Sequence, residues 1–262
     1  GRYAPIVPIV PHTASAAKHP MYEELGYTRT RRLALAICAF AYLYVFPYQS
    51  KLNNPNENVR FYMTAALVEE GRYEIDAMRE RWGHVNDAAV RDGHHYSVKA
   101  PGTSFLGVPG YALYRQFTSI FNRPFDRTQA LWVCRFTACI LPSLLFLYAF
   151  HGWLHRRGHH PALRDAVFFS VALGSLLYGY GMLFVSHTLS AAAAFSAFML
   201  LSEPRRHTPT DLPTAPRLGW QAFAAGVLAA LTTLFEYPGL LCSIVLTVSE
   251  PPATLAAGLE RA

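Results

Sequence analysis

The hydrophobic pattern divides the chain into long apolar runs and one long, mostly polar segment. Apolar and aromatic residues fill residues 33–50, 129–153, 165–202 and 218–248, whereas residues 51–128 are largely polar. A helix of about 17 to 20 apolar residues crosses a hydrocarbon core of about 30 Å. The pattern predicts an all-α integral membrane protein: a polytopic helical bundle with a long outer-face loop at 51–128 that carries an amphipathic helix.

The run at 165–202 is too long for one span. As a single helix, residues 166–201 would extend about 54 Å at about 1.5 Å per residue, so we expect a turn between Tyr178 and Thr188. The expected spans are therefore 33–50, 129–153, 165–182, 184–202, 218–236 and the start of a sixth at 239–248. Residues 1–32 would form a cytoplasmic tail, and we expect the segment 249–262 to be truncated.

Basic residues set the expected orientation. They gather in the tail and in two short connections, at Arg29, Arg31, Arg32, His155, Arg156, Arg157, Arg164, Arg205, Arg206 and Arg217. The positive-inside rule places all three groups in the cytoplasm and the loop on the outer face, which predicts a multi-pass protein of a bacterial inner membrane. Counting the apolar segment 104–114 as a span would move the basic connection between His155 and Arg164 to the outer face, against its charge. Because Gly107 and Pro109 also interrupt it, we interpret it as a helix at the membrane interface.

Composition supports the membrane class. Hydrophobic residues make up 52% of the chain and aromatic residues 14%. The net charge of +6 does not indicate nucleic-acid binding, because the arginines flank apolar runs; the expected partner is the lipid bilayer. The four cysteines lie in apolar runs without metal-ligand spacing, which favours a packing role for Cys38, Cys134, Cys139 and Cys242.

The start of the polar loop has helical periodicity. Apolar residues recur at helical spacing over residues 57–70, and Asn56 and Gly71 are expected to cap and end the helix. Glu57, Arg60 and Thr64 then share one polar stripe. Near the helix N-terminus, the carboxylate of Glu57 is favoured as an anion and could act as a general base or bind a cation. The alternative is an ordinary surface pair between Glu57 and Arg60.

Further polar residues lie at the end of the loop. Lys99 precedes a rigid Ala-Pro-Gly turn that would hold its ammonium near the phosphate of an anionic lipid, although simple snorkelling to head groups is the alternative. His94 and His95 are expected to point to opposite sides of an extended segment. No ligand spacing joins them to His84 or His187, so no metal ligands are predicted, and a divalent metal is left as an open alternative.

Two charged residues lie in or at the ends of apolar runs. Arg135 falls inside the run at 129–153, and Glu236 follows the run at 218–235. Charged residues within spans are costly and are usually functional or paired. A structural pair between Arg135 and Glu236 is the alternative to a functional role.

Several short motifs together resemble the GT-C membrane glycosyltransferases, the group that includes protein O-mannosyltransferases and lipid A aminoarabinose transferases. The resemblance covers about residues 33–248 and consists of Asn56-Glu57, Tyr62, Ala66 and Gly71, of Lys99-Ala100-Pro101-Gly102, of Arg135 before Pro142, and of residues 231–236. It implies transfer of a sugar from a polyprenyl-phosphate carrier to an acceptor glycan, lipid or protein. Glu57 would be the catalytic acid, and substrate binding would involve Asn56, Arg60, Lys99, Arg135, His187 and Glu236.

The chain departs from the family pattern at three of these positions. Asn56 stands where relatives have an aspartate, His187 where they often have a second carboxylate, and Glu236 where they usually have a lysine. Asp76, Asp87 and Asp92 are rival acids in the same loop. The competing class is a non-enzymatic transporter of lipid-linked sugars or a membrane scaffold. The absence of an internal sequence repeat favours an enzyme.

Overall fold

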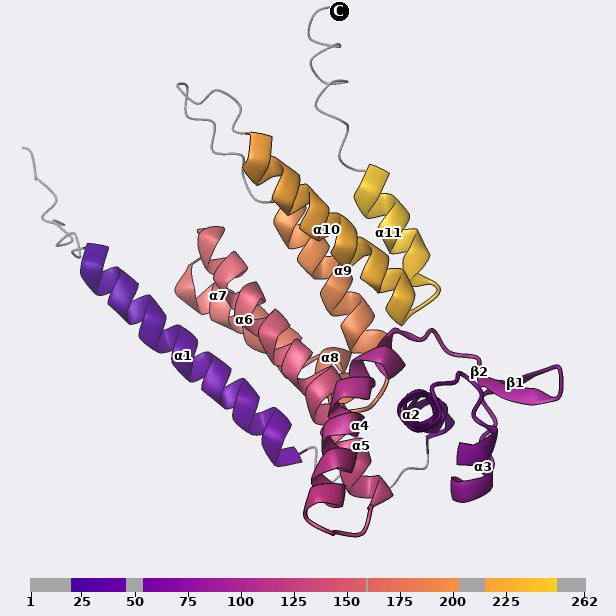
Figure 1. Cartoon of the computed structure of the whole chain (residues 1–262). Helices are drawn as coiled ribbons and strands as arrows, with labels where there is room; N and C mark the ends of the chain where they lie inside the picture. Colours follow the sequence, from indigo (N-terminus) through magenta and orange to yellow (C-terminus); the bar gives the residue numbers. More distant parts are fainter. Residues whose placement is uncertain (1–19, 46–53, 159, 203–214, 249–262) are drawn as a thin grey trace, which may run out of the picture.

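The computed structural model describes residues 20–45, 54–158, 160–202 and 215–248, and within them the chain is mostly helical. Long helices lie alongside one another and form a bundle, with a smaller group of elements at one of its ends (Figure 1). The bundle contains α1 (Pro20–Val45), α6 (Leu141–Arg156), α7 (Pro161–Ala172), α8 (Leu176–Gly181), α9 (His187–Leu201), α10 (Ala215–Phe235) and α11 (Gly239–Val248).

The polar loop folds into the smaller group of elements. It contains α2 (Pro55–Glu69), α3 (Asp76–Trp82), β1 (Ala88–Arg91), β2 (His94–Ser97) and α4 (Gly102–Ile120). The two strands form an antiparallel hairpin, and its tight turn has positive φ at both Asp92 (52°) and Gly93 (85°). Asp-Gly is favoured in such turns because both residues tolerate this conformation. The hairpin corrects the all-α expectation, while the mostly helical class holds.

One helix in the described part of the chain is long and apolar enough to cross a membrane. It runs continuously from Arg127 to Arg156 through α5 (Arg127–Arg135), the π-helical turn η2 (Phe136–Ile140) and α6, and it contains the expected span 129–153. The wide π turn lies just before Pro142, whose ring cannot fit a regular helical turn and which has no N–H to donate. The other spans stay predictions, since the apolar helices His187–Leu201, Trp220–Phe235 and Gly239–Val248 are shorter.

Other helix boundaries differ from the expected spans. Helix α1 begins at Pro20, inside the expected tail, and residues 46–53 lie outside the described part of the chain. The run at 165–202 breaks twice, after Ala172 and after Gly181, where one turn near residue 180 was expected. Ser175 explains the first restart, because its hydroxyl accepts a hydrogen bond from the Leu177 N–H and caps α8 (3.2 Å).

The segment expected at the membrane interface is part of a longer packed helix. Helix α4 extends from Gly102 to Ile120 and packs against α2, α5 and α10. Gly107 and Gly110 do not break it; both are buried, where small residues allow neighbouring helices to approach closely. Helix α4 therefore connects the polar loop to the bundle.

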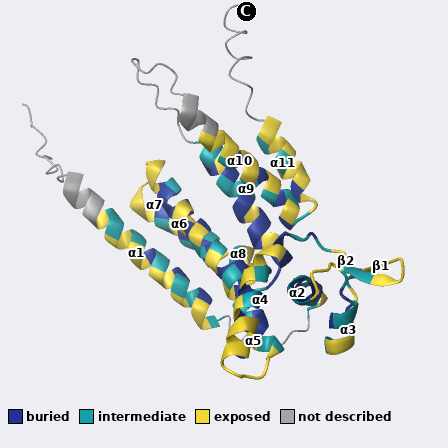
Figure 2. Cartoon of the chain, in the orientation of Figure 1, coloured by how far each residue is buried: buried dark blue, intermediate teal, exposed yellow. Residues whose placement is uncertain are grey.

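Buried residues form two main clusters. One joins α2, α3, α4 and α5 with the first turns of α9, and the other joins α1, α6 and α7 with Ala192 and Met199 of α9. Many exposed positions lie along α1, α10 and α11 (Figure 2), and several of them carry large apolar side chains. Examples are Leu33, Phe40, Trp220, Phe223, Leu241 and Val248.

Candidate functional site

Helix α2 begins earlier and lies deeper than the periodicity predicts. Asn54, not Asn56, is its N-cap: the Asn54 side chain accepts a hydrogen bond from the Asn56 N–H (3.0 Å), and Pro55 takes the first helical position. The stripe of Glu57, Arg60 and Thr64 is buried, together with every residue from 59 to 66. The expected amphipathic surface helix is therefore an interior helix, and its polar residues need partners inside the protein.

Glu57 finds its main partner in Arg135. The Arg135 guanidinium donates from Nε to Glu57 Oε1 (2.9 Å) and from Nη2 to Oε2 (2.8 Å), and the Phe184 N–H also donates to Oε1 (2.6 Å). Both charged side chains are almost fully buried. Neither the Glu57–Arg60 surface pair nor the Arg135–Glu236 pair is present. Glu57 instead holds together α2, α5 and the chain before α9.

Arg60 lies on the same helix and connects the loop to a different part of the bundle. Its Nη2 donates to Ser186 Oγ (2.5 Å) and lies 3.6 Å from Glu236 Oε1, while Nη1 donates to the Asn56 carbonyl (3.2 Å). Burial lowers the pKa of the Arg60 guanidinium, and the carboxylate of Glu236 partly offsets that effect. Because arginine stays charged in proteins, Arg60 acts as a buried cation.

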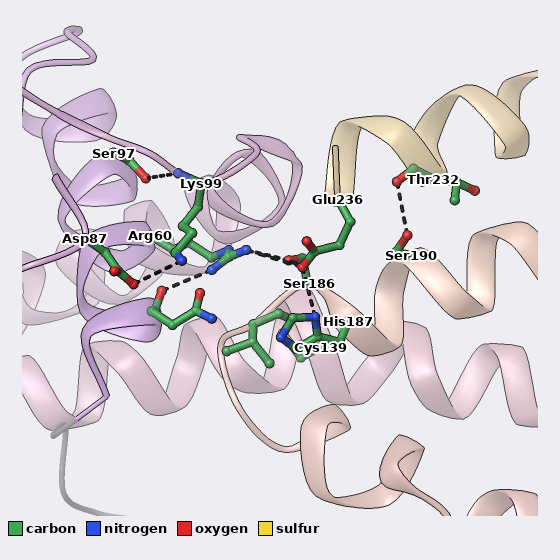
Figure 3. A network of polar contacts seen from close by, with 12 residues as sticks. Arg60, Asp87, Ser97, Lys99, Cys139, Ser186, His187, Ser190, Thr232 and Glu236 are labelled. Carbon is green, nitrogen blue, oxygen red and sulfur yellow. Dashed lines mark hydrogen bonds and ion pairs between the residues drawn. The ribbon is translucent and has the colours of Figure 1, made fainter. Parts of the chain in front are cut away.

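Glu236 joins these groups at the end of α10. It accepts a short hydrogen bond from Ser186 and lies 3.0 Å from His187 Nδ1, so Arg60, Ser186, His187 and Glu236 form one polar network (Figure 3). The Arg60 side chain is 1% exposed, Glu236 is 24% exposed and His187 is 44% exposed. The network therefore runs from the interior to the surface, where a ligand can reach it.

Lys99 and Asp87 border this network. Lys99 Nζ lies 3.1 Å from Asp87 Oδ2, and Figure 3 shows this pair facing Arg60. Both side chains keep about a third of their surface exposed. The Lys99 ammonium thus has a carboxylate partner in the protein, in place of the free snorkelling considered from the sequence.

The turn after Lys99 is anchored to α10. A Cβ atom on Gly102 would lie 2.6 Å from Phe235 Cδ1 and 2.7 Å from the Leu234 carbonyl oxygen. Such distances exclude any side chain, so glycine allows α4 to begin in contact with the end of α10. This contact places Lys99 near Glu236 and gives a structural reason for the glycine in the Lys-Ala-Pro-Gly motif.

Asn56 adds an unused acceptor beside Arg60. Its backbone carbonyl accepts from Arg60, but its side-chain oxygen is buried and has no hydrogen-bond partner among the described residues. Unpaired buried acceptors are costly and often mark a place where a ligand or water donates. Asn56 therefore remains a candidate for substrate binding.

The structure brings most of the predicted site residues into two adjacent groups. Asn56, Arg60, His187 and Glu236 share the exposed network with Lys99 beside it, whereas Glu57 and Arg135 form the buried pair. Sequence reasoning missed Ser186, which links Arg60 to Glu236. Its position just before the apolar run of α9 was the available signal.

The two adjacent histidines lie away from this network, and both contact the same residue. His94 Nδ1 lies 3.1 Å from Asp76 Oδ2, and His95 Nδ1 lies 2.6 Å from Asp76 Oδ1. The two rings were expected to point to opposite sides of the strand. That expectation is wrong, because both rings contact the same carboxylate, which Asp76 brings from α3. No group of three or more His, Cys, Asp or Glu residues in the described ranges is arranged to hold a metal.

Comparison with protein-family models, curated protein sequences and solved structures finds no match to the chain. The class of protein therefore has to be argued from the sequence motifs and from the geometry of the site.

Proposed function

We propose that the chain is a multi-pass inner-membrane glycosyltransferase of the GT-C type, which transfers a sugar from a polyprenyl-phosphate carrier to an acceptor on the outer face. One observation supports this most. The loop residue Arg60 meets the helix-end residue Glu236, which also contacts His187, in a partly exposed polar site at one end of apolar helices, and the pair of Lys99 and Asp87 lies beside it. A lipid-linked donor presents its phosphate at such a place.

The site has the charges that the reaction needs. The acceptor oxygen attacks the anomeric carbon, the bond from that carbon to the phosphate oxygen breaks, and the acceptor proton goes to a carboxylate. Negative charge grows on the departing polyprenyl phosphate, and fixed cations stabilise it. Lys99, whose side chain is partly exposed, supplies the cation that a phosphate can reach, and the buried Arg60 adds positive charge behind it; Arg135 is held in the buried pair with Glu57.

The carboxylates differ in their access to an acceptor. Glu57 is buried, with both oxygens hydrogen-bonded, so it would act as the base only if the pair with Arg135 opened. Glu236 and Asp87 have exposed surface and lie beside the cations. A general base must come within hydrogen-bond reach of the acceptor, which favours these two acids for proton transfer.

An apolar groove supports a lipid substrate. It lies between α9 and α11, has a volume of about 420 Å³ and is lined by Ala191, Ala194, Phe195, Phe198, Leu241, Cys242, Val245 and Leu246. Ala191 is one helical turn from His187, so the groove begins close to the polar network. The isoprenoid tail of a carrier would lie along this groove while its phosphate lies at Lys99, with the charge of Arg60 behind it.

The test measures transfer from a labelled polyprenyl-phosphate sugar by the purified chain in lipid nanodiscs, with carrier binding measured separately. Lys99→Ala should weaken carrier binding by about tenfold or more, because it removes a charge-assisted contact to phosphate. Arg91→Ala is the matched control, since Arg91 is 84% exposed on the hairpin. Carrier binding without transfer would favour a transporter or scaffold. Equal binding of neutral polyprenol would overturn the phosphate site.

A further inference from the structure

A second polar cluster lies at the other end of the bundle, between α1, α6 and α7. Tyr27 and Arg31 are one turn apart on α1 and face His151 and His155, one turn apart on α6. The Tyr27 ring stacks on the ring of His155 at 3.5 Å between centroids and lies 5.8 Å from that of His151. The Arg31 guanidinium lies 3.8 Å from the centre of the Tyr148 ring and donates to the Tyr148 carbonyl (2.9 Å).

This cluster contains polar atoms that the protein leaves unpaired. Tyr27 Oη, Arg31 Nε and both ring nitrogens of His151 are buried without a hydrogen-bond partner in the described part of the chain. His151 is 0% exposed. Asp165 is the nearest carboxylate, but its Oδ1 is 3.7 Å from His151 Nε2, too far for a hydrogen bond. Leaving several such groups unpaired is costly, so they indicate a missing partner.

The missing partner has to accept hydrogen bonds and carry negative charge. Arg31 Nε can only donate, and Tyr27 and one nitrogen of a neutral His151 also donate. The guanidinium of Arg164 lies 5.4 Å from the centre of the Tyr27 ring, and those of Arg31 and Arg156 both lie against Gly152. Asp165, which accepts from Arg164 Nε (2.7 Å), is the carboxylate among these contacts. Arg31 and Arg164 therefore bring two guanidinium charges to the described part of the cluster, and Asp165 is the carboxylate beside them.

The surroundings indicate where the anion comes from. The side chains of Leu33, Tyr148 and Leu163, on the three helices of the cluster, are more than half exposed and apolar or aromatic. The basic residues His155, Arg156 and Arg157 end α6 beside them. Basic pockets between helices at the cytoplasmic side of a membrane suit anionic lipid head groups, with the acyl chains against the apolar residues.

We propose that Tyr27, Arg31, His151 and Arg164 bind the phosphate of an anionic membrane lipid. The inference rests on the membrane placement in the proposed function but not on glycosyl transfer. The proposed lipid site lies at the opposite end of the bundle from Lys99. The lipid phosphate would accept hydrogen bonds from the unpaired donors and hold α1 against α6 and α7.

The experiment measures lipids retained by the purified full chain by native mass spectrometry, after exchange into detergent containing dioleoylphosphatidylglycerol or dioleoylphosphatidylcholine. One phosphatidylglycerol should be retained in preference to phosphatidylcholine. Arg31→Gln and Tyr27→Phe should each weaken its retention, by about tenfold for the arginine, because a charge-assisted contact is lost. Arg32→Gln is the matched control: it removes the same charge from an exposed neighbour on α1 and should retain the lipid.

Three outcomes would overturn the proposal. Equal retention of the two lipids would mean that the site does not select an anion. Equal loss in Arg31→Gln and Arg32→Gln would show attraction by the general surface charge only. Competition by millimolar inorganic phosphate as effective as that by phosphatidylglycerol would make it a site for free phosphate.

The Tyr27→Phe variant removes one hydroxyl and keeps the ring stacking, so it tests the site even if Arg31→Gln folds poorly. Sugar transfer from the polyprenyl-phosphate carrier is measured for Arg31→Gln in parallel. This second measurement separates the result on lipid binding from the glycosyltransferase proposal.

Discussion

Glu57 and Arg135 are 78 residues apart in the sequence and form a two-pronged ion pair that is almost completely buried. The pair joins the first helix of the polar loop to the helix that is long enough to cross a membrane. Because the Phe184 N–H donates to the same carboxylate, three distant segments depend on one side chain. Residues predicted to act on a substrate thus also hold the site together.

Glu57→Gln should destabilise the protein. It leaves the Arg135 charge buried without a matching anion, and breaking a buried pair in this way typically costs about 3–5 kcal/mol. The melting temperature of the purified chain in detergent should fall, and the double variant Glu57→Gln/Arg135→Met should recover part of the loss because it removes both charges. Glu70→Gln, at an exposed position one residue after α2, is the control. An unchanged melting temperature for Glu57→Gln would show that the pair is not structural and would restore the case for Glu57 as a free catalytic acid.

Glu236→Gln should lower transfer from the polyprenyl-phosphate donor. Glu236 is a partly exposed carboxylate in contact with Ser186 and His187, and loss of a general base costs about 10² to 10⁴ in rate. Asp92→Asn is the matched control, because Asp92 is 86% exposed and asparagine tolerates its positive φ. The same assay with Asp87→Asn identifies the alternative base. Full activity in both Glu236→Gln and Asp87→Asn would remove both acids from the chemistry.

Much of the fold follows from local sequence signals. The apolar run before and after Arg135 predicts the long helix, and Gly71, with φ of 67°, follows the end of α2 as expected. The hairpin was not predicted, although Asp92-Gly93 at its turn is a local signal for one. The burial of α2 could not be predicted from periodicity, because its polar residues find partners from α5, α9 and α10. A stripe that contains Glu57 and Arg60 has the same spacing whether it faces water or buried partners.

The sequence predicts which residues belong to the candidate site, but it does not predict which of them pair with one another. The pairing depends on which helix ends meet, and that is decided by contacts such as Gly102 against Phe235. Arg135 and Glu236 were considered as partners because both are charged residues in or next to apolar runs. In the structure each pairs with a residue of α2, since that helix lies between them. Long-range packing of this kind has no local sequence signature.

Acid should release the hairpin from α3. Burial works to raise the pKa of the Asp76 carboxyl, but hydrogen bonds from the His95 ring, the His95 N–H and the His94 ring outweigh it and lower this pKa. A carboxyl with a lowered folded-state pKa stabilises the fold above its unfolded pKa of about 3.9, and that contribution is lost as the pH falls through the folded value. Hydrogen exchange of the β1 and β2 amides should therefore be faster, relative to unstructured amides, near pH 3 than near pH 6. Asp76→Asn should remove most of this difference, and an equally large difference in that variant would assign it to another group.

The hairpin and the connection after α6 should lie on opposite sides of the membrane. They lie at opposite ends of the bundle in Figure 1, and the basic residues that end α6 favour the cytoplasmic side. A single cysteine at Arg91 or at Arg156 can be labelled with a membrane-impermeant thiol reagent in intact cells and in inverted vesicles. Only the exposed Cys242 needs to be replaced first, since Cys38, Cys134 and Cys139 are buried and protected. Arg91→Cys should react in intact cells and Arg156→Cys only in inverted vesicles. Reaction of both from the same side would contradict the membrane arrangement, and with it the outer-face site around Lys99 and the lipid site around Arg31.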